Sequence, residues 1–510
     1  MTTRPDTWYQ RVSRSWALPI AVVLAAIAAS VGGALSQPMW GDEVASARVL
    51  SEPNVSDVLQ HVRRTESTPP AWYVLGWSVS KADDALALGA LSSPVERLRV
   101  LSVLFATAAS LLTALWARRL LGDQILGALA GLLVALGSTP AAYAGQLRAY
   151  ALLMLLSVTF GLLLVEVSAR PGISSWSWLG LALSVWLGTM THYFFFFTVV
   201  AGGVWLWASR PQPPGRRATT LALALGLLAF LPWLPAFLEQ LQHGRYRWIG
   251  GFDPRAVAAL PGSLFFGPDG VFYGFARIAL TVALVVGSVV LWKRPGGSAV
   301  VALGLLPIAG ATVIWALGQP IFDERNMIGA APFLAIVIAA SVHALPKQLV
   351  TPIALASIAA AIIGATLVPG NLGRIAYGDI AQALVGLGWT ADDPIVVDSP
   401  RARTSLRIAV AWYLPDHPTL TRAQAPRTHE CSPLFVVGHS SIFASWVTRH
   451  RRSVEDLRWF ASYDHPFSGR ENGQILVARL RAPADLPGDA FYVRSRATKC
   501  RGETRTPPPS

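Results

Sequence analysis

Residues 149–168 read AYALLMLLSVTFGLLLVEVS, and Glu166 is the single side chain among them that is charged at neutral pH. Because an α-helix rises about 1.5 Å per residue, a run of this length crosses roughly 30 Å of lipid hydrocarbon. A helix on the surface of a soluble protein would carry charged residues along one face. The run therefore predicts a transmembrane helix.

Runs of similar character recur over the first 370 residues. One of them contains Gly137 to Pro140, which are expected to cut its helix short. The composition agrees, because 53% of the residues are hydrophobic, 14% are charged and the mean hydropathy is +0.45, as is typical of membrane proteins. We expect an all-α polytopic membrane bundle of about eleven spans, at about 16–36, 99–117, 124–142, 149–168, 176–193, 194–209, 218–237, 273–292, 298–316, 327–345 and 350–368.

Lys and Arg indicate the orientation, because positively charged flanks stay on the cytoplasmic side. With residues 1–15 inside, every inner loop carries at least one cation, although Arg97 and Arg99 break the pattern. An odd number of spans then places the loop 37–98 and the chain after residue 370 outside. The sequence predicts a multi-pass protein of the cell inner (plasma) membrane. The cations that set this orientation are Arg4, Arg11, Arg14, Arg118, Arg119, Arg170, Arg210, Arg216, Arg217, Lys293, Arg294 and Lys347.

The first apolar run, 16–36, has a second interpretation as a cleaved signal peptide. Its length of about 21 apolar residues exceeds a usual h-region of about 7 to 15, which favours a retained helix. The net charge of +13 would suggest nucleic acid as the partner of a soluble protein, but the inner loops account for much of it. Membrane lipids are therefore expected as partners, and nucleic acid is not.

The segment 369–500 is expected to form a small extracytoplasmic α/β domain. It contains both cysteines, Cys431 and Cys500, and such a distribution fits a disulfide in an oxidising compartment, with two unpaired thiols as the alternative. The Pro-rich tail 501–510 is predicted to be disordered. The expected strands are Ile395–Val397, Leu434–Val437 and Ile475–Val477, and the expected helices are Thr404–Tyr413 and Ser441–His450.

Acidic residues lie in the long outer loop, which also contains two amphipathic stretches near 53–64 and 70–90. Asp42 and Glu43 follow the first span, where a carboxylate could deprotonate a hydroxyl arriving from outside. The alternative is structural, with Asp42 as the N-cap of a helix over Val44–Leu50 and Glu43 in its first turn.

Glu66 precedes Pro69-Pro70 and the aromatic pair Trp72-Tyr73 in the same loop. A stiff Pro-Pro turn could hold this carboxylate facing Asp42. The alternative is an ordinary loop that enters an interfacial helix, with Trp72 and Tyr73 as residues of the aromatic belt.

Two arginines lie at outer ends of spans, Arg148 in Gln146–Tyr150 and Arg325 in Asp323–Asn326. A cation at this depth costs free energy unless it is paired or solvated, and a guanidinium suits a phosphate. The alternative for Arg148 is an interfacial anchor that snorkels to headgroups. For Arg325 it is a polar turn neutralised by its acidic neighbours.

His192 near the outer end of another span is a candidate ligand for a phosphate or a sugar hydroxyl, with a structural role as the alternative. Arg247 belongs to a later outer loop that is rich in cations and aromatic residues. That mixture suits sugars or phosphates, and it equally suits interfacial anchoring.

Together these motifs resemble the GT-C superfamily of membrane glycosyltransferases, in the branch related to protein O-mannosyltransferases and aminoarabinose transferases. The resemblance covers about residues 15 to 345 and rests on the order of five short signatures. They are Asp42-Glu43, Pro69-Pro70 with Trp72-Tyr73, Gln146 to Tyr150, Thr191-His192-Tyr193, and Phe322 to Asn326 before Pro332. Thr68 and Arg325-Asn326 depart from the usual residues at their positions, which leaves the substrate open.

The resemblance implies a glycosyltransferase domain at 16–368 with its catalytic outer loop at 37–98. The sugar would come from a polyprenyl-phosphate donor and pass, with inversion, to a hydroxyl of a lipid, glycan or protein. Asp42 would be the base, supported by Glu43. Arg148, Arg325 and His192 would bind the donor phosphate, and Glu66, Tyr150 and Arg247 would position the acceptor or the loop.

A divalent cation, Mg²⁺ or Mn²⁺, could bind Asp42, Glu43 and Glu66 through their oxygens. A phosphate held by arginines does not require one. The main alternative function is a polytopic transporter or lipid flippase, which predicts charges deep within spans. Here the charged residues lie at the boundaries of the predicted spans, apart from Glu166 near an inner end. A noncatalytic sensor is a further alternative, in which Asp42 and Glu43 would be dispensable.

Overall fold

The computed structural model describes residues 17–36, 39, 41–86, 94–169, 175–209, 211, 213–244, 249–267, 275–367, 377–390, 395–398, 419–420, 434–439, 454–460 and 475–480. They divide into two compact units. The first, the helical unit, comprises the described residues of 17–36 and 49–367. The second comprises 39–48 and the described residues from 377 onwards.

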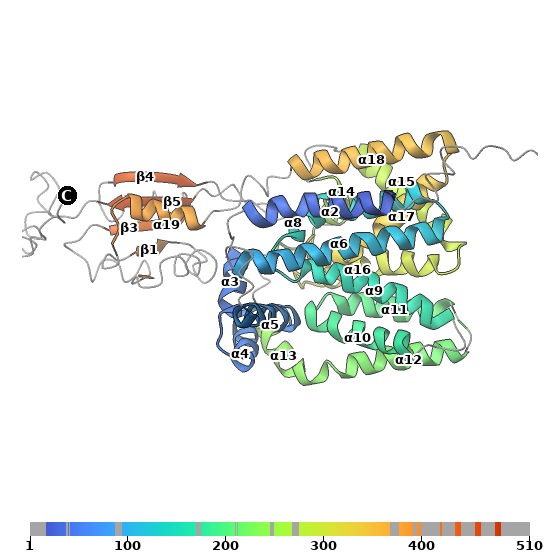
Figure 1. The fold of residues 1–510 in the computed structure, drawn as a ribbon, viewed down its shortest axis with the longest axis horizontal. Coiled ribbons are helices and arrows are strands. Elements are labelled where there is room, and N and C mark those ends of the chain that lie inside the picture. Colours follow the sequence, from blue (N-terminus) through green and yellow to red (C-terminus); the bar gives the residue numbers. More distant parts are fainter. Residues whose placement is uncertain are drawn as a thin grey trace, which may run out of the picture. The chain divides into compact units, whose positions relative to one another are not determined.

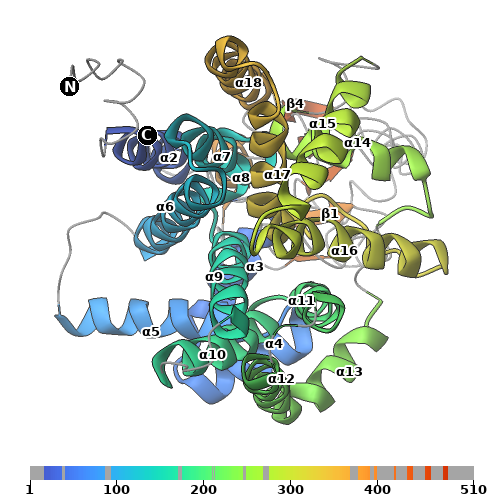
Figure 2. The same ribbon diagram turned by 90° about the vertical axis from the view of Figure 1, so that its right-hand side faces the viewer.

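A helix or a helix pair occupies each of the eleven predicted runs in the helical unit. The long helices run in nearly the same direction in Figure 1, and several are seen end-on in Figure 2. Their bounds are α2 Ala17–Ser36, α6 Pro94–Leu121, α7 Gln124–Leu136, α8 Ser138–Ala144, α9 Tyr150–Ala169, α10 Ser175–Thr191, α11 Phe195–Ser209, α12 Pro213–Leu228, α13 Leu234–Gln242, α14 Pro254–Phe265, α15 Phe275–Trp292, α16 Gly297–Ala316, α17 Ala331–His343 and α18 Lys347–Leu367.

Five helices among the described residues are long and apolar enough to cross a membrane, judged by length and composition. Helices α7 and α8 make a sixth if they count as one span, and they meet at an angle of 58°. Gly137, which separates them, has an extended backbone, so the predicted interruption of this run is confirmed. The full count of eleven spans stays a prediction.

The outer surfaces of the helices carry the side chains expected of a protein dissolved in lipid. On α15, Ile278, Val282, Val285 and Val289 are all more than half exposed, and their spacing puts them on one face of the helix. The interior is also apolar, with Phe333 of α17 fully buried. An apolar exterior around an apolar core is what a membrane bundle requires and what a water-soluble bundle avoids.

Two short helices of the outer loop, α4 (Val55–Thr65) and α5 (Ala71–Leu86), coincide with the predicted amphipathic stretches. Asn54 caps α4 by accepting a hydrogen bond from the backbone of Asp57. Helix α5 is viewed end-on in Figure 1 and along its length in Figure 2, so it lies across the direction of the bundle. The backbone carbonyl of Val62 accepts a 2.9 Å hydrogen bond from Gln240 Nε2, which fastens α4 to α13.

The second unit holds most of α3 (Gly41–Leu50), helix α19 (Tyr377–Gly386) and a five-stranded sheet of order β2-β1-β3-β5-β4. Strand β1 pairs in parallel with β2 and β3, whereas β5 pairs antiparallel with β3 and β4. Strands β1, β3 and β5 lie at the three predicted apolar runs. The bounds are β1 Ile395–Asp398, β2 Thr419–Leu420, β3 Leu434–His439, β4 Val454–Phe460 and β5 Ile475–Leu480.

Some predictions for the tail fall outside the described residues, namely the helices at 404–413 and 441–450 and the pair Cys431 and Cys500. The sequence did not predict β4, whose letters VEDLRWF place charges along the whole strand. Its assignment needs the antiparallel pairing with β5, which a local sequence pattern does not contain.

Candidate functional site

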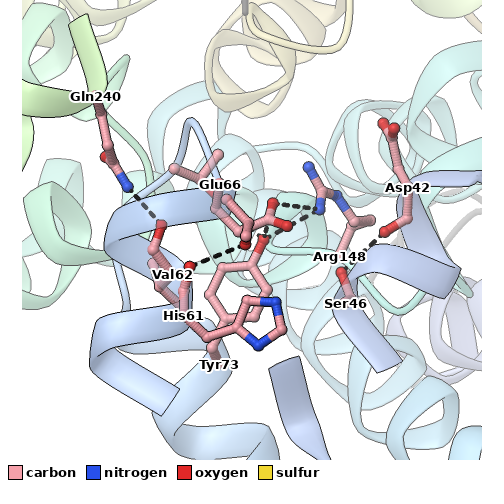
Figure 3. Close-up of polar contacts among 10 residues, drawn as sticks. Asp42, Ser46, His61, Val62, Glu66, Tyr73, Arg148 and Gln240 are labelled. Carbon is pink, nitrogen blue, oxygen red and sulfur yellow. Dashed lines mark hydrogen bonds and ion pairs between the residues drawn. The ribbon is translucent and has the colours of Figure 1, made fainter. Parts of the chain in front are cut away.

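Helix α3 presents the two acids that follow the first span. It begins at Gly41, so Asp42 and Glu43 both lie in its first turn, where the helix dipole favours negative charge. The predicted alternative of a helix ending at Leu50 with Glu43 in its first turn is therefore confirmed, whereas Asp42 is wrong as its N-cap because it lies inside the helix. Glu43 is buried, and Ser46 Oγ donates a 3.1 Å hydrogen bond to the backbone carbonyl of Asp42 (Figure 3).

A buried polar network in the helical unit joins the outer loop to the start of α9. Arg148 Nη1 donates to Glu66 Oε2 at 3.2 Å and to the phenol oxygen of Tyr73 at 3.0 Å. The Tyr73 hydroxyl in turn donates to Glu66 Oε2 at 2.7 Å. Figure 3 shows the carboxylate, the phenol and the guanidinium converging.

Thr68 completes the network, because its Oγ1 lies 3.2 Å from the Tyr73 phenol oxygen. A phenol has one hydrogen to donate and two lone pairs that accept. With Glu66 as acceptor and Arg148 and Thr68 as donors, the phenol of Tyr73 is saturated. Burial raises the pKa of this phenol well above its ordinary value of 10.0, so it stays protonated and donates to Glu66.

Arg148 is 8% exposed and Glu66 is 6% exposed, so both charges are removed from solvent. A buried cation without a partner would cost several kcal/mol, and the pairing with Glu66 offsets that cost. The interpretation of Arg148 as a snorkelling anchor is therefore wrong. Trp72 and Tyr73 are also buried, so they do not act as exposed belt residues.

Aromatic rings continue from this network towards α10. The ring of Tyr150, the first residue of α9, lies 4.7 Å from that of Tyr143 and 5.9 Å from that of His192, measured between centroids. His192 directly follows α10 and is buried. The guanidinium charges of Arg148 and Arg325 both act on His192.

Arg325 belongs to a turn between α16 and α17. Its Nε lies 3.4 Å from Asp323 Oδ1, and its backbone N–H donates to the same oxygen at 3.1 Å. The predicted alternative of a turn neutralised by acidic neighbours is thus present in the structure. Asp323 and Glu324 are both buried, and Arg325 also acts electrostatically on Tyr143.

The helical unit therefore brings together five of the predicted site residues, which come from well-separated parts of the sequence. Tyr73, Thr68 and Tyr143 belong to the same region and were not predicted. The Pro69-Pro70 pair between Thr68 and Tyr73 is the sequence feature that could have indicated that these two side chains meet. The five are Glu66, Arg148, Tyr150, His192 and Arg325.

The other predicted site residues do not belong to this cluster as described. Asp42 and Glu43 belong to the second unit, and Arg247 lies outside the described residues. Within the described parts of the chain, no group of three or more His, Cys, Asp or Glu side chains could hold a metal ion. Glu66 Oε2 is instead shared by Tyr73 and Arg148.

No family model matches the sequence, and no curated protein matches it significantly. Solved structures do match. ArnT from Cupriavidus metallidurans in the apo state has a TM-score of 0.52 and 12% identity, covering 91% of this chain and 97% of ArnT. The fold is similar to that of ArnT.

ArnT bound to undecaprenyl phosphate matches equally, with a TM-score of 0.51, 12% identity, and coverage of 91% of this chain and 98% of ArnT. ArnT is an aminoarabinose transferase of the GT-C superfamily. The resemblance predicted from the motifs is thus confirmed at the level of the fold.

Proposed function

We propose that this protein is an integral membrane glycosyltransferase that moves a sugar from a polyprenyl-phosphate donor to an acceptor hydroxyl at the outer face of the membrane. The observation that carries the proposal is the gathering of Arg148, His192 and Arg325 at ends of the helices of an apolar bundle, ends that the predicted topology assigns to the outer face. Its fold is similar to that of ArnT, which has been solved with undecaprenyl phosphate.

A polyprenyl-phosphate sugar has two parts with opposite solvent preferences. Its prenyl chain needs an apolar surface, which the helices supply, and its phosphate needs cations at the edge of that surface. Arg148 and Arg325 are such cations, and each already has an acidic neighbour. A guanidinium has five N–H donors, and the hydrogen bonds from Arg148 to Glu66 and Tyr73 both come from Nη1.

The transfer step balances without a further reactant. The acceptor oxygen forms a bond to the anomeric carbon while the bond from that carbon to the phosphate oxygen breaks, and its electron pair leaves with the phosphate. The acceptor proton passes to a carboxylate. The leaving phosphate gains negative charge in the transition state, which Arg148 and Arg325 would stabilise.

Asp42 is the proposed base, on the sequence resemblance alone, and Glu43 beside it would raise the local negative charge. Entry of the acceptor opposite the phosphate would invert the anomeric centre. The acceptor would be a lipid, a glycan or a protein. Whether Mg²⁺ or Mn²⁺ assists at Asp42, Glu43 and Glu66 is a separate proposal, since no step above requires an ion.

A transporter or flippase is the competing function, and it would place charges along the middle of spans. Within the described residues, Glu166 lies near the inner end of α9 and accepts a 3.3 Å hydrogen bond from Ser177 Oγ. The charges of the cluster instead lie next to helix ends, with Arg148 before α9, His192 after α10 and Arg325 before α17. Their distribution favours catalysis at the membrane boundary over passage across it.

The test is transfer of radiolabelled sugar by purified protein from a panel of polyprenyl-phosphate donors, with crude membranes as the acceptor and with or without a chelator. Asp42→Asn and Arg148→Lys should each lower transfer about 100-fold or more. Glu239→Gln, an acid of α13 outside the cluster, should keep wild-type transfer. If transfer is lost only when the chelator is present, the reaction requires a divalent ion.

Absence of transfer by folded wild-type protein across the panel would favour the transporter. Wild-type turnover by Asp42→Asn would remove Asp42 as the base and leave the rest of the proposal standing. The configuration of the product, read by NMR, decides whether the anomeric centre inverts.

A further inference from the structure

We infer that Tyr73 is a positioning residue for the phosphate-binding Arg148, an inference that rests on the proposed function of that arginine. Tyr73 does not need to touch the substrate for this role. Its phenol oxygen bonds Arg148 Nη1 at 3.0 Å while its hydrogen is given to Glu66 Oε2 at 2.7 Å. The phenol therefore makes a hydrogen bond to each member of a buried ion pair, the Glu66 carboxylate and the Arg148 guanidinium.

The hydrogen-bond count explains why a phenol is suited to this place. Glu66 Oε2 and the phenol oxygen both accept from Arg148 Nη1, and the 2.7 Å hydrogen bond between them closes a triangle of three polar atoms. A guanidinium is planar and rigid, so two bonds to one terminal nitrogen fix the orientation of the whole fork. The opposite edge, made of Nε and Nη2, then points in one defined direction.

Without the phenol, Arg148 Nη1 would lose its 3.0 Å hydrogen bond and keep the 3.2 Å contact to Glu66 Oε2. The triangle that orients this end of the guanidinium would then be open. Thr68 contacts the phenol oxygen at 3.2 Å, and Pro69 and Pro70 directly precede α5. Tyr73 is 1% exposed, so no water is expected to replace its hydroxyl.

This role predicts a specific kinetic pattern. The negative charge on the donor phosphate increases as the bond to the sugar breaks, so a misdirected Arg148 loses more stabilisation in the transition state than in the ground state. Tyr73→Phe should lower kcat about tenfold, while the donor KM changes less than about twofold. Inhibition by the product, polyprenyl phosphate, should weaken in parallel with kcat.

The experiment is a double-mutant cycle in the full-length protein with Tyr73→Phe, Arg148→Lys and both together. Readouts are kcat, donor KM and the direct binding of polyprenyl phosphate, which needs no turnover. If Tyr73 acts through Arg148, the double variant should lose about as much as Arg148→Lys alone, roughly 100-fold. An independent structural role predicts additive losses, roughly 1000-fold.

Tyr193→Phe is the matched control. Its hydroxyl is also bonded to two side chains, since it accepts from Trp233 Nε1 at 3.0 Å and donates to Gln240 Oε1. Losses from this variant should add to those of Arg148→Lys. If Tyr73→Phe does not fold, Thr68→Val weakens the same phenol and should show the same pattern with a smaller loss, about threefold.

Additive losses for Tyr73→Phe, or the same non-additivity for Tyr193→Phe, would overturn the inference. If Arg148→Lys retains wild-type kcat and polyprenyl-phosphate binding, the proposed function of Arg148 fails instead. Non-additive loss of polyprenyl-phosphate binding supports the positioning role even if the sugar of the true donor is missing from the panel.

Discussion

The phenol oxygen of Tyr73 lies 3.0 Å from Nη1 of Arg148, although 75 positions separate the two residues in the sequence. Tyr73 belongs to α5 of the outer loop, and Arg148 lies just before α9 of the bundle. Within the helical unit, the contact therefore fixes α5 to the segment that precedes α9. Because Glu66 takes part in the same network, both stability and the proposed phosphate site depend on it.

The first prediction concerns the buried ion pair. Glu66→Gln should lower the free energy of unfolding by about 3 kcal/mol, because Arg148 would keep its charge in a buried place after losing the carboxylate of Glu66. The amide can still accept the hydrogen bond of Tyr73, so the loss measures mainly the missing charge. Thermal unfolding of the protein in detergent, followed by tryptophan fluorescence, reports the change.

The control for this variant is Glu239→Gln. Glu239 also pairs with an arginine of the outer loop, Arg63, but the side chains are 35% and 50% exposed. An exposed pair contributes about 0 to 1 kcal/mol, so Glu239→Gln should unfold almost as the wild type does. Equal destabilisation by the two variants would contradict a buried, charge-dependent role for Glu66.

The second prediction concerns the attachment of α4 to α13. Gln240 is 3% exposed and donates to the Val62 carbonyl at 2.9 Å. Gln240→Ala leaves that carbonyl without its side-chain donor and should increase local opening of α4 by about tenfold, since about 1.4 kcal/mol corresponds to that factor. Cleavage by trypsin after the exposed Arg63 and Arg64 should accelerate accordingly.

Gln242→Ala, on the exposed side of α13, is the control and should leave the cleavage rate unchanged. Acceleration in both variants would indicate that α13 itself unfolds, and no acceleration in Gln240→Ala would show that other contacts hold α4.

The bundle could be predicted from the sequence largely because lipid imposes a length and a composition on each span. A related reason made it possible to choose Arg148, His192 and Arg325 as candidates. Polar groups at the edge of an apolar run cost free energy unless they are paired or solvated, so they mark candidate functional sites. The break after α7 was visible in Gly137 and Pro140.

The pairing of Glu66 with Arg148 could not be predicted, because 82 positions separate them and no local pattern reports such a contact. Tyr73 was misjudged for another reason. A Trp-Tyr pair beside a span is typical of the aromatic belt, and only burial against Arg148 and Glu66 distinguishes a network residue from a belt residue.

The third prediction concerns the titration of Tyr73. Burial raises the pKa of its phenol above the ordinary value of 10.0, so the folded state disfavours the phenolate. The contribution of this phenol to the free energy of unfolding is complete below about pH 10 and decreases as the pH rises further. Above that pH, Tyr73 loses its proton in the unfolded chain while it stays protonated in the folded one. The free energy of unfolding of Tyr73→Phe should therefore decrease less than that of the wild type between about pH 10 and 11.

Tyrosinate absorbance provides a direct reading. While the protein remains folded, wild type and Tyr73→Phe should show the same increase up to about pH 11, since Tyr73 does not contribute to it. A larger increase in the wild type over this range would mean that Tyr73 ionises normally and is not buried as described.

The last prediction concerns the close approach of α15 and α17. A Cβ atom added at Gly287 would lie 1.9 Å from the carbonyl oxygen of Val337, closer than any non-bonded contact allows. Backbone cannot move aside as a flexible side chain does, and overpacking costs about 1 to 3 kcal/mol or more. Gly287→Ala should therefore separate the two helices and lower the yield of monodisperse protein in size-exclusion chromatography. Gly203→Ala in α11 is the matched control, because nothing lies within 4 Å of the added atom and alanine favours a helix over glycine by about 1 kcal/mol. It should elute as the wild type does and unfold at the same or a higher temperature. Equal yields for the two variants would mean that α15 and α17 do not pack at Gly287, and the helix arrangement around α17 would need revision.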